Sequence, residues 1–133
     1  MIDIIIPVSA GELMDKLTIL EIKKNRIADS HKLRFINDEY DRLNEIAIRL
    51  DLYTIVDAKV LDNLRLVNLA LWNIINEMMI METTETFNYV YYDLAKKIRS
   101  LNDDRYECKS AIDNIIDSDV KEQKGYTDVE IND

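Results

Sequence analysis

Residues 57–82 carry the strongest apolar pattern in the chain. Apolar side chains recur there at alternating spacings of four and three, at Val60, Leu64, Val67, Leu71, Ile74, Met78 and Met81. This spacing is typical of one continuous line of contact along a helix. Further apolar residues, among them Trp72 and Met79, lie off that line, and a helix that is apolar nearly all round is normally buried on several sides. The pattern therefore predicts a long central helix, with Leu71 fully buried midway along it.

Amphipathic patterns predict three more helices. At the start of the first, Ser9 and Glu12 form a capping box, in which each side chain can bond the backbone N–H of the other residue. The last predicted helix begins at a Thr83 cap and keeps a mostly apolar heptad through Ile115, which favours one continuous helix over a break at 102–104. The four predicted helices span residues 9–28, 32–50, 57–82 and 84–117, and residues 118–133 form a tail.

The two ends of the chain predict one further element. Residues 2–6 are β-branched apart from Asp3 and are followed by Pro7, which indicates a short edge strand. A strand needs a partner, and residues 129–131 could supply it within the chain or across a dimer. Only two glycines and one proline occur in 133 residues, too few turn residues for a protein of many strands. The predicted fold is a single all-α domain, an antiparallel four-helix bundle with long central and C-terminal helices and a short N-terminal strand.

Composition and charge exclude some classes of function. The net charge of −9 argues against a protein that neutralises nucleic-acid phosphates or anionic lipid, because both need a basic face. No apolar run approaches the roughly twenty residues that cross a bilayer, and the start of the chain lacks the regions of a signal peptide. Cys108 is the single cysteine, so no intramolecular disulfide can form. We therefore expect a cytoplasmic protein without cofactors that contacts neither nucleic acid nor membrane.

Three stretches share a pattern with other proteins. They read IPVSAGELMDKLTILEIKKNRI at residues 6–27, VNLALW at 67–72 and LNDDRYECKSAIDNIIDSDVKEQKGY at 101–126. In them the chain resembles an uncharacterised family of short, all-helical bacterial and phage proteins, whose pattern begins IPVSxGELxDKxTILEIK. The matching residues are Ser9, Gly11, Glu12, Asp15, Lys16, Thr18, Glu21, Lys23, Asn68, Trp72, Asn102, Asp103, Arg105, Lys109, Ser118, Glu122, Lys124 and Tyr126. The resemblance implies a fold but no activity, and the acidic residues that the pattern places after Trp72 are replaced here by NIIN at 73–76.

Arg105 is the residue most out of keeping with its position. The heptad places it on the apolar line of the last helix, between Leu101 and Cys108. A charge there must be paired or reach water, since burying it alone would cost several kcal/mol. The first helix carries matching carboxylates, Asp15 and Glu21, among its apolar residues. We therefore expect Arg105 to contact Asp15 or Glu21 and to bring the two helices side by side.

Charged residues of the first and last helices admit two interpretations. They can form ordinary surface ion pairs, worth only a few tenths of a kcal/mol each. Alternatively, they line a shared polar cleft that holds a small anionic or zwitterionic ligand. The candidate ligand-binding residues are Glu12, Asp15, Lys16, Glu21, Lys23, Asn102, Asp103, Arg105 and Lys109. No residue is assigned a catalytic or metal-binding role.

Two classes of enzyme offer comparisons. All-α nucleotide pyrophosphohydrolases hold Mg²⁺ with paired acidic motifs on facing helices, but only one half of that arrangement is present, from Glu12 to Asp15. Helical chorismate mutases clamp a dicarboxylate with several basic residues. The basic residues available here do not match the spacing of that family; they are Lys16, Lys23, Arg26 and Arg105. The sequence therefore favours a non-catalytic interaction or regulatory module that binds a protein or a small anionic ligand. The alternative is a small helical enzyme acting on an anionic metabolite or nucleotide, with or without Mg²⁺.

Apolar surface left over on the predicted helices points to self-association. A four-helix monomer leaves Met14, Ile22, Trp72 and Tyr92 hard to cover. We therefore expect a homodimer whose interface uses apolar surface of the first or central helix. Trp72, or the side chains of Tyr89 and Tyr92, should lie near that interface.

Overall fold

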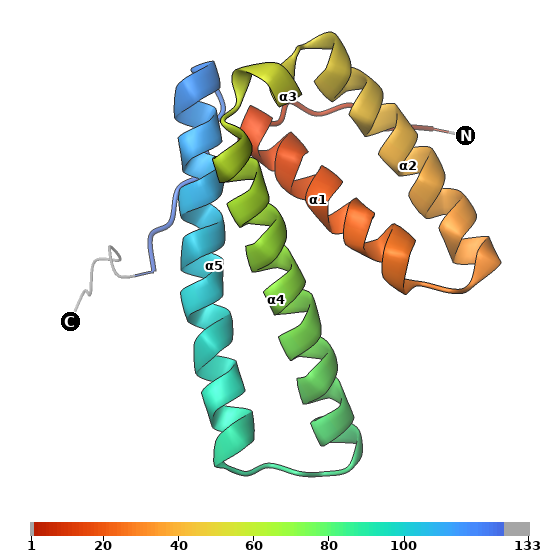
Figure 1. Ribbon diagram of the computed structural model, residues 1–133, viewed down its shortest axis with the longest axis vertical. Helices are drawn as coiled ribbons and strands as arrows, with labels where there is room; N and C mark the ends of the chain where they lie inside the picture. Colours follow the sequence, from red (N-terminus) through yellow and green to blue (C-terminus); the bar gives the residue numbers. More distant parts are fainter. Residues whose placement is uncertain (1, 127–133) are drawn as a thin grey trace.

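The computed structural model describes residues 2–126 and consists of helices joined by short connections (Figure 1). The helices are α1 (Ala10–Arg26), α2 (Ser30–Arg49), α3 (Leu52–Ile55), α4 (Ala58–Thr83) and α5 (Tyr89–Ile116). The all-α prediction is confirmed, and each of the four predicted helical ranges corresponds to one long helix. The single turn of α3 lies in the connection between α2 and α4, where the sequence predicts no helix.

The long helices form two antiparallel hairpins, α1 with α2 and α4 with α5 (Figure 1). Helix α1 packs against both helices of the α4–α5 hairpin, whereas α2 packs on α1 and on α3. This arrangement differs from the predicted antiparallel four-helix bundle, because α2 packs mainly on α1 and α3 and does not complete a ring with the α4–α5 hairpin. The cause is the apolar pattern: α2 has one apolar stripe and fully buries only Ala47, while α1 is buried on a broad face.

The core is centred where α1 meets the α4–α5 hairpin, and Ala47 of α2 and Leu52 of α3 also belong to it. Leu17 of α1, Leu64 of α4 and Ile112 of α5 are at most 1 % exposed there. Leu71 is 6 % exposed, so its predicted burial is confirmed, but the core is centred nearer to Leu64. The predicted central position of residues 57–82 holds for the N-terminal part of this helix and not for its C-terminal part. Because α4 has 26 residues and α1 only 17, the C-terminal part of α4 runs beyond α1, beside α5 (Figure 1).

The helix ends follow local capping chemistry. The Ser9 side chain accepts a 3.0 Å hydrogen bond from the N–H of Glu12, so the Ser9 half of the predicted capping box is confirmed. The Glu12 carboxylate pairs with Lys109 instead of bonding back to Ser9. The predicted Thr83 cap of α5 is wrong, because Thr83 ends α4 and its hydroxyl bonds the carbonyl of Met79. Asn88 caps α5 instead, accepting from the N–H groups of the next turn. Helix α5 is continuous through residues 102–104, which excludes the predicted alternative of a break.

The predicted N-terminal strand is wrong, because residues 2–126 contain no strand. Residues 2–8 run as an extended, exposed segment, in which Ile4 and Ile5 are 84 % and 93 % exposed. An ion pair of 2.7 Å between Asp3 and Arg42 tethers this segment to α2. The strand partner considered at residues 129–131 lies outside the described residues. Within residues 2–126, no helix has the length and apolarity needed to cross a membrane.

Candidate ligand-binding site

A buried polar network joins α1, α4 and α5. The carboxylate of Asp15 on α1 is 1 % exposed and receives two hydrogen bonds from the Arg105 guanidinium on α5, of 2.8 Å from Nε and 2.5 Å from Nη2. Asn68 on α4 donates from Nδ2 to Asp15 at 2.9 Å and to the Thr18 hydroxyl at 2.8 Å. The predicted contact of Arg105 with Asp15 or Glu21 is therefore confirmed for Asp15. Such a network fixes the register of the three helices.

The network keeps Arg105 charged and in place. Its hydrogen bonds with Asp15 raise the pKa of Arg105 above the usual value, against the opposing effect of burial. Because two of its nitrogens are bound to a buried carboxylate, the guanidinium is fixed in orientation before any ligand arrives. The Arg105 side chain remains 30 % exposed, so it is in part accessible to solvent.

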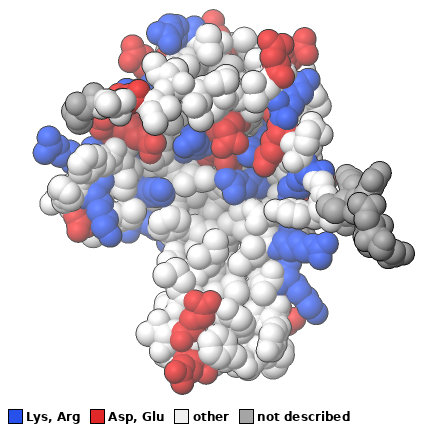
Figure 2. Space-filling model, turned by 180° about the vertical axis from the view of Figure 1, so that it is seen from behind, with Lys and Arg blue, Asp and Glu red and all other residues white. Residues whose placement is uncertain are grey.

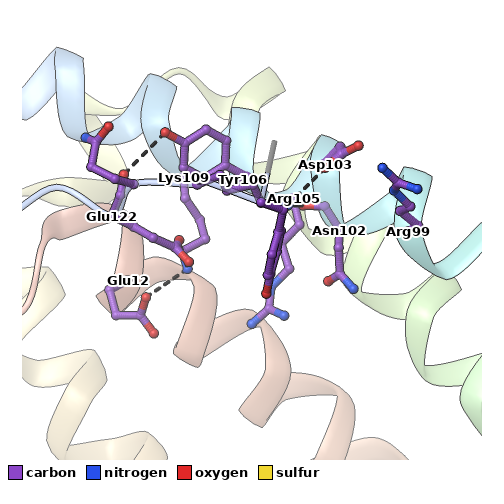
Figure 3. Close-up of a pocket in the computed structure, with 12 residues that line it drawn as sticks. Glu12, Arg99, Asn102, Asp103, Arg105, Tyr106, Lys109 and Glu122 are labelled. Atoms are coloured by element: carbon purple, nitrogen blue, oxygen red, sulfur yellow. Dashed lines mark hydrogen bonds and ion pairs between the residues drawn. The ribbon is translucent and has the colours of Figure 1, made fainter. Parts of the chain in front are cut away.

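A second polar cluster lies one turn further along α5. The Lys109 ammonium, whose side chain is 8 % exposed, lies 2.8 Å from the Glu12 carboxylate and 2.7 Å from that of Glu122 (Figure 3). Burial lowers the pKa of Lys109, but its hydrogen bonds to Glu12 and Glu122 outweigh that effect and raise the pKa overall. Lys109 therefore links α1, α5 and the tail through charged groups.

Residues 118–126 turn back along α5 and are fastened to it. The Tyr106 hydroxyl donates to the carbonyl of Glu122 at 3.3 Å. The Lys124 ammonium donates to the carbonyl of Asn102 at 3.3 Å and to the carboxylate of Asp103 at 3.0 Å. The tail thereby forms one wall of a cleft whose other wall is α5 (Figure 3).

This cleft has a volume of about 930 Å³. Its lining residues are Glu12, Arg99, Asn102, Asp103, Arg105, Tyr106, Lys109, Glu122, Gln123, Lys124, Gly125 and Tyr126. A smaller hollow of about 240 Å³ shares Glu12 and Arg105 with it and extends along α1, past Lys16 and Lys23, to Glu39 on α2. Arg105 therefore borders both spaces.

The cleft is nearly balanced in charge, unlike the acidic chain as a whole. Its walls carry four cationic side chains, Arg99, Arg105, Lys109 and Lys124, and three anionic ones, Glu12, Asp103 and Glu122. Figure 2 shows groups of both signs interspersed across the middle of the molecule. Guanidinium and ammonium groups bind carboxylate or phosphate, and the carboxylates bind an ammonium group. Within residues 2–126, no cluster of three or more His, Cys, Asp or Glu side chains is arranged to hold a metal ion.

Eight of the nine predicted site residues border these two spaces. Glu12, Asn102, Asp103, Arg105 and Lys109 line the larger cleft, and Asp15, Lys16 and Lys23 line the smaller hollow. Glu21 does not belong with them, because it binds Arg65 of α4 at 3.1 Å. Glu21 follows Asp15 by six positions, and this spacing places the Glu21 side chain on another face of α1.

Several residues of the site escape the prediction. Asn68 and Thr18 complete the buried network, and Tyr106, Glu122 and Lys124 complete the cleft. An amide in the middle of a largely apolar helix was the local signal for Asn68. All of these residues except Tyr106 belong to the pattern that carries the family resemblance. For Glu122 and Lys124, this membership is the feature of the sequence that could have identified them as site residues.

Fold and site together define a small all-α protein with a mixed-charge cleft beside a buried ion pair. The family of unknown function DUF6165 matches residues 4–132, and the chain belongs to this family. Comparisons with curated proteins and with solved structures give no significant match.

Proposed function

We propose that the protein is a non-catalytic binding module that takes a small anionic or zwitterionic ligand in the cleft beside Arg105. The observation that carries the proposal is the anchoring of Arg105 by two hydrogen bonds to Asp15, a carboxylate only 1 % exposed. Within residues 2–126, Arg105 Nη1 has no hydrogen-bond partner. A rigidly held guanidinium with free donors beside a cleft is suited to binding a carboxylate or phosphate.

Energetics favour a binding role over a purely stabilising one. Burying Asp15 and half-burying Arg105 removes water from both charges, and the attraction between two buried charges often only offsets that cost. Replacing a buried ion pair by an apolar pair of similar volume is often neutral or even stabilising. A fixed, partly exposed guanidinium is what the ion pair adds and an apolar pair lacks.

The surrounding groups select the class of ligand. Lys124 and Arg99 line the same cleft as Arg105 and add positive charge that would attract a carboxylate or phosphate. An ammonium group on the ligand would pair with Glu122 or Glu12, whose carboxylates now share Lys109. Amino acids satisfy both requirements and small phosphorylated metabolites satisfy the first, and the cleft volume of about 930 Å³ accommodates either class.

Isothermal titration calorimetry with L-glutamate, citrate, inorganic phosphate and ATP tests the proposal. We expect at least one of these probes to bind, and Lys124→Met to weaken its binding while leaving the buried ion pair intact. Arg105→Met should abolish binding. Arg65→Met is the matched control, because it removes an arginine paired with Glu21 outside the cleft.

Three outcomes would overturn the proposal. Binding that is equally weakened by Arg65→Met, or unchanged by both cleft variants, would remove the cleft from consideration. Hydrolysis of bound ATP in the presence of Mg²⁺, lost in Glu12→Gln, would replace the binding module with the alternative of a small enzyme.

A further inference from the structure

The ends of α4 and α5 that meet at residues 84–88 extend beyond α1 and α2 as a two-helix lobe (Figure 1). Large apolar side chains are exposed on it: Ile75, Met79, Ile80, Phe87, Tyr89 and Tyr92, each between 45 % and 76 % exposed. Figure 2 shows this lobe as largely uncharged, with acidic groups near its tip. Isolated apolar residues on a surface are ordinary, but a contiguous group of this kind indicates an interaction surface.

One face of the lobe continues the surface on which α1 packs. Asn68 marks that surface on α4, because its side chain bonds Asp15 and Thr18 of α1. At about 100° per residue, Ile75 and Met79 project within roughly 20° of the direction of Asn68. Both lie on the part of α4 that runs beyond α1, where Ile75 is 45 % and Met79 is 58 % exposed.

The same holds for α5. Lys109 marks the surface that α1 covers there, because it pairs with Glu12. Tyr91 precedes Lys109 by eighteen residues, which is five full turns, and so projects in the same direction. Ile75, Met79 and Tyr91 thus define one face of the lobe. Helix α1 covers the continuation of this face near Asn68 and Lys109, but no helix within residues 2–126 covers it on the lobe itself.

The charge distribution indicates which molecule covers the lobe face. The tip of the lobe is acidic, with exposed Glu82 and Glu85. The flank of α1 that borders the smaller hollow carries Lys16 and Lys23, and no ion pair to either occurs within residues 2–126. If a second copy is turned end for end over the lobe face, its acidic tip meets these lysines and its apolar face meets Ile75 and Met79.

We propose that a second copy of this chain packs antiparallel on the lobe face, so that two α4–α5 lobes form a four-helix bundle about a twofold axis. A twofold contact uses the same patch on both copies, and this patch carries its own complement, apolar in the middle and oppositely charged at its two ends. The α1–α2 hairpins then lie at opposite ends of the dimer.

Sedimentation equilibrium of the full chain and its variants tests this dimer. The wild-type chain should sediment at twice its mass of 15.6 kDa. Replacing both Ile75 and Met79 by glutamate should raise the dimer dissociation constant at least about 30-fold, the effect of losing one strong interface residue. Leu66→Glu is the matched control: Leu66 is 64 % exposed on α4 but projects about 160° away from Asn68, so this variant should remain dimeric.

The charged ends test the antiparallel orientation. Lys23→Glu places a like charge opposite Glu82 and should weaken the dimer, and adding Glu82→Lys in the same chain should restore it. Because all of these side chains are accessible in the monomer, each variant should remain folded, and circular dichroism checks this. A 15.6 kDa species at every concentration, equal losses from Leu66→Glu and the paired substitution, or no rescue by the charge exchange would overturn the proposal.

Discussion

The backbone N–H of Gly11 donates a 2.6 Å hydrogen bond to the carboxylate of Asp113, so the first turn of α1 is closed by the last turn of α5. A neighbouring bond of 3.2 Å runs from the N–H of Ala10 to the hydroxyl of Ser118. The first N–H groups of a helix have no partner within it, and a carboxylate beside them is favourable. This junction sets the approach of α1 to α5 and thereby the position of Glu12 and Asp15 at the cleft.

The approach at Gly11 leaves no room for a side chain. A Cβ at this position would overlap the carbonyl oxygen of Lys109 and lie 2.8 Å from the Asp113 carboxylate. We expect Gly11→Ala to destabilise the fold by about 1–3 kcal/mol, because the gain of about 1 kcal/mol in helix propensity is smaller than the cost of moving α1 away from α5. Urea unfolding measures the loss. Gly125→Ala is the control, since a Cβ there meets nothing within 4 Å, and equal effects of the two substitutions would contradict the steric explanation.

The two partners of the buried ion pair should respond unequally to substitution. Arg105→Met leaves the carboxylate of Asp15, 1 % exposed, without its cation and should cost about 3–5 kcal/mol. Asp15→Asn should cost less, because the Arg105 side chain is 30 % exposed and its charge can turn to water. A double-mutant cycle by chemical unfolding measures the coupling. A coupling energy near zero would mean that the pair does not hold α1 on α5.

Two leucines of α4 separate the core from the surface. Leu64 is fully buried where α1 meets the hairpin, whereas Leu66, two residues on, is 64 % exposed. Leu64→Ala should lower the free energy of unfolding by about 2–5 kcal/mol, and so should Leu71→Ala, because each leaves a cavity. Leu66→Ala should cost less than about 1 kcal/mol. Similar losses for Leu64 and Leu66 would contradict the assigned orientation of α4.

Alkaline pH should weaken the contact between α2 and α3. The Tyr53 hydroxyl donates to Asn44 at 2.5 Å, and burial raises the pKa of Tyr53 from 10.0 to about 12. A pKa that is higher in the folded than in the unfolded chain stabilises the fold fully below about pH 10, and this stabilisation is lost as the pH rises through about 12. Unfolding free energies across this range measure the decline. Tyr53→Phe should remove this part of the pH dependence, and an unchanged profile in that variant would assign the decline to other groups.

The sequence predicts best those features whose cause is local. Arg105 stands out because a charge interrupts an apolar heptad, and the need to neutralise a buried charge limits its partner to a carboxylate on α1. The choice between Asp15 and Glu21 requires the rotation of α1 against α5, which no local pattern contains. That rotation depends on the contact of Gly11 with Lys109 and Asp113, more than ninety residues away along the chain.

The tail and the lobe depend on features that leave weak marks in the sequence. The chain turns back after α5 at Asp117, which adopts a left-handed conformation (φ 57°). A glycine at this position would have indicated such a turn in the sequence, but an aspartate does not. Without that turn, the contacts of Glu122 and Lys124 with α5 cannot be foreseen. The apolar residues of α4 predict burial correctly near Leu64, but the same pattern continues past the end of α1. Periodicity identifies a face that requires a partner and does not say whether the partner lies in the same chain.

The closure of α1 by Asp113 and Ser118 has a consequence for the order of folding. These two bonds span 102 and 108 residues, so a chain emerging from the ribosome presents α1 long before it presents the groups that complete the first turn of α1. The α4–α5 hairpin relies on contacts closer in sequence, which form faster. The first helix to be synthesised is thus the last to reach its final position, and until then its apolar face depends on α2 alone for cover.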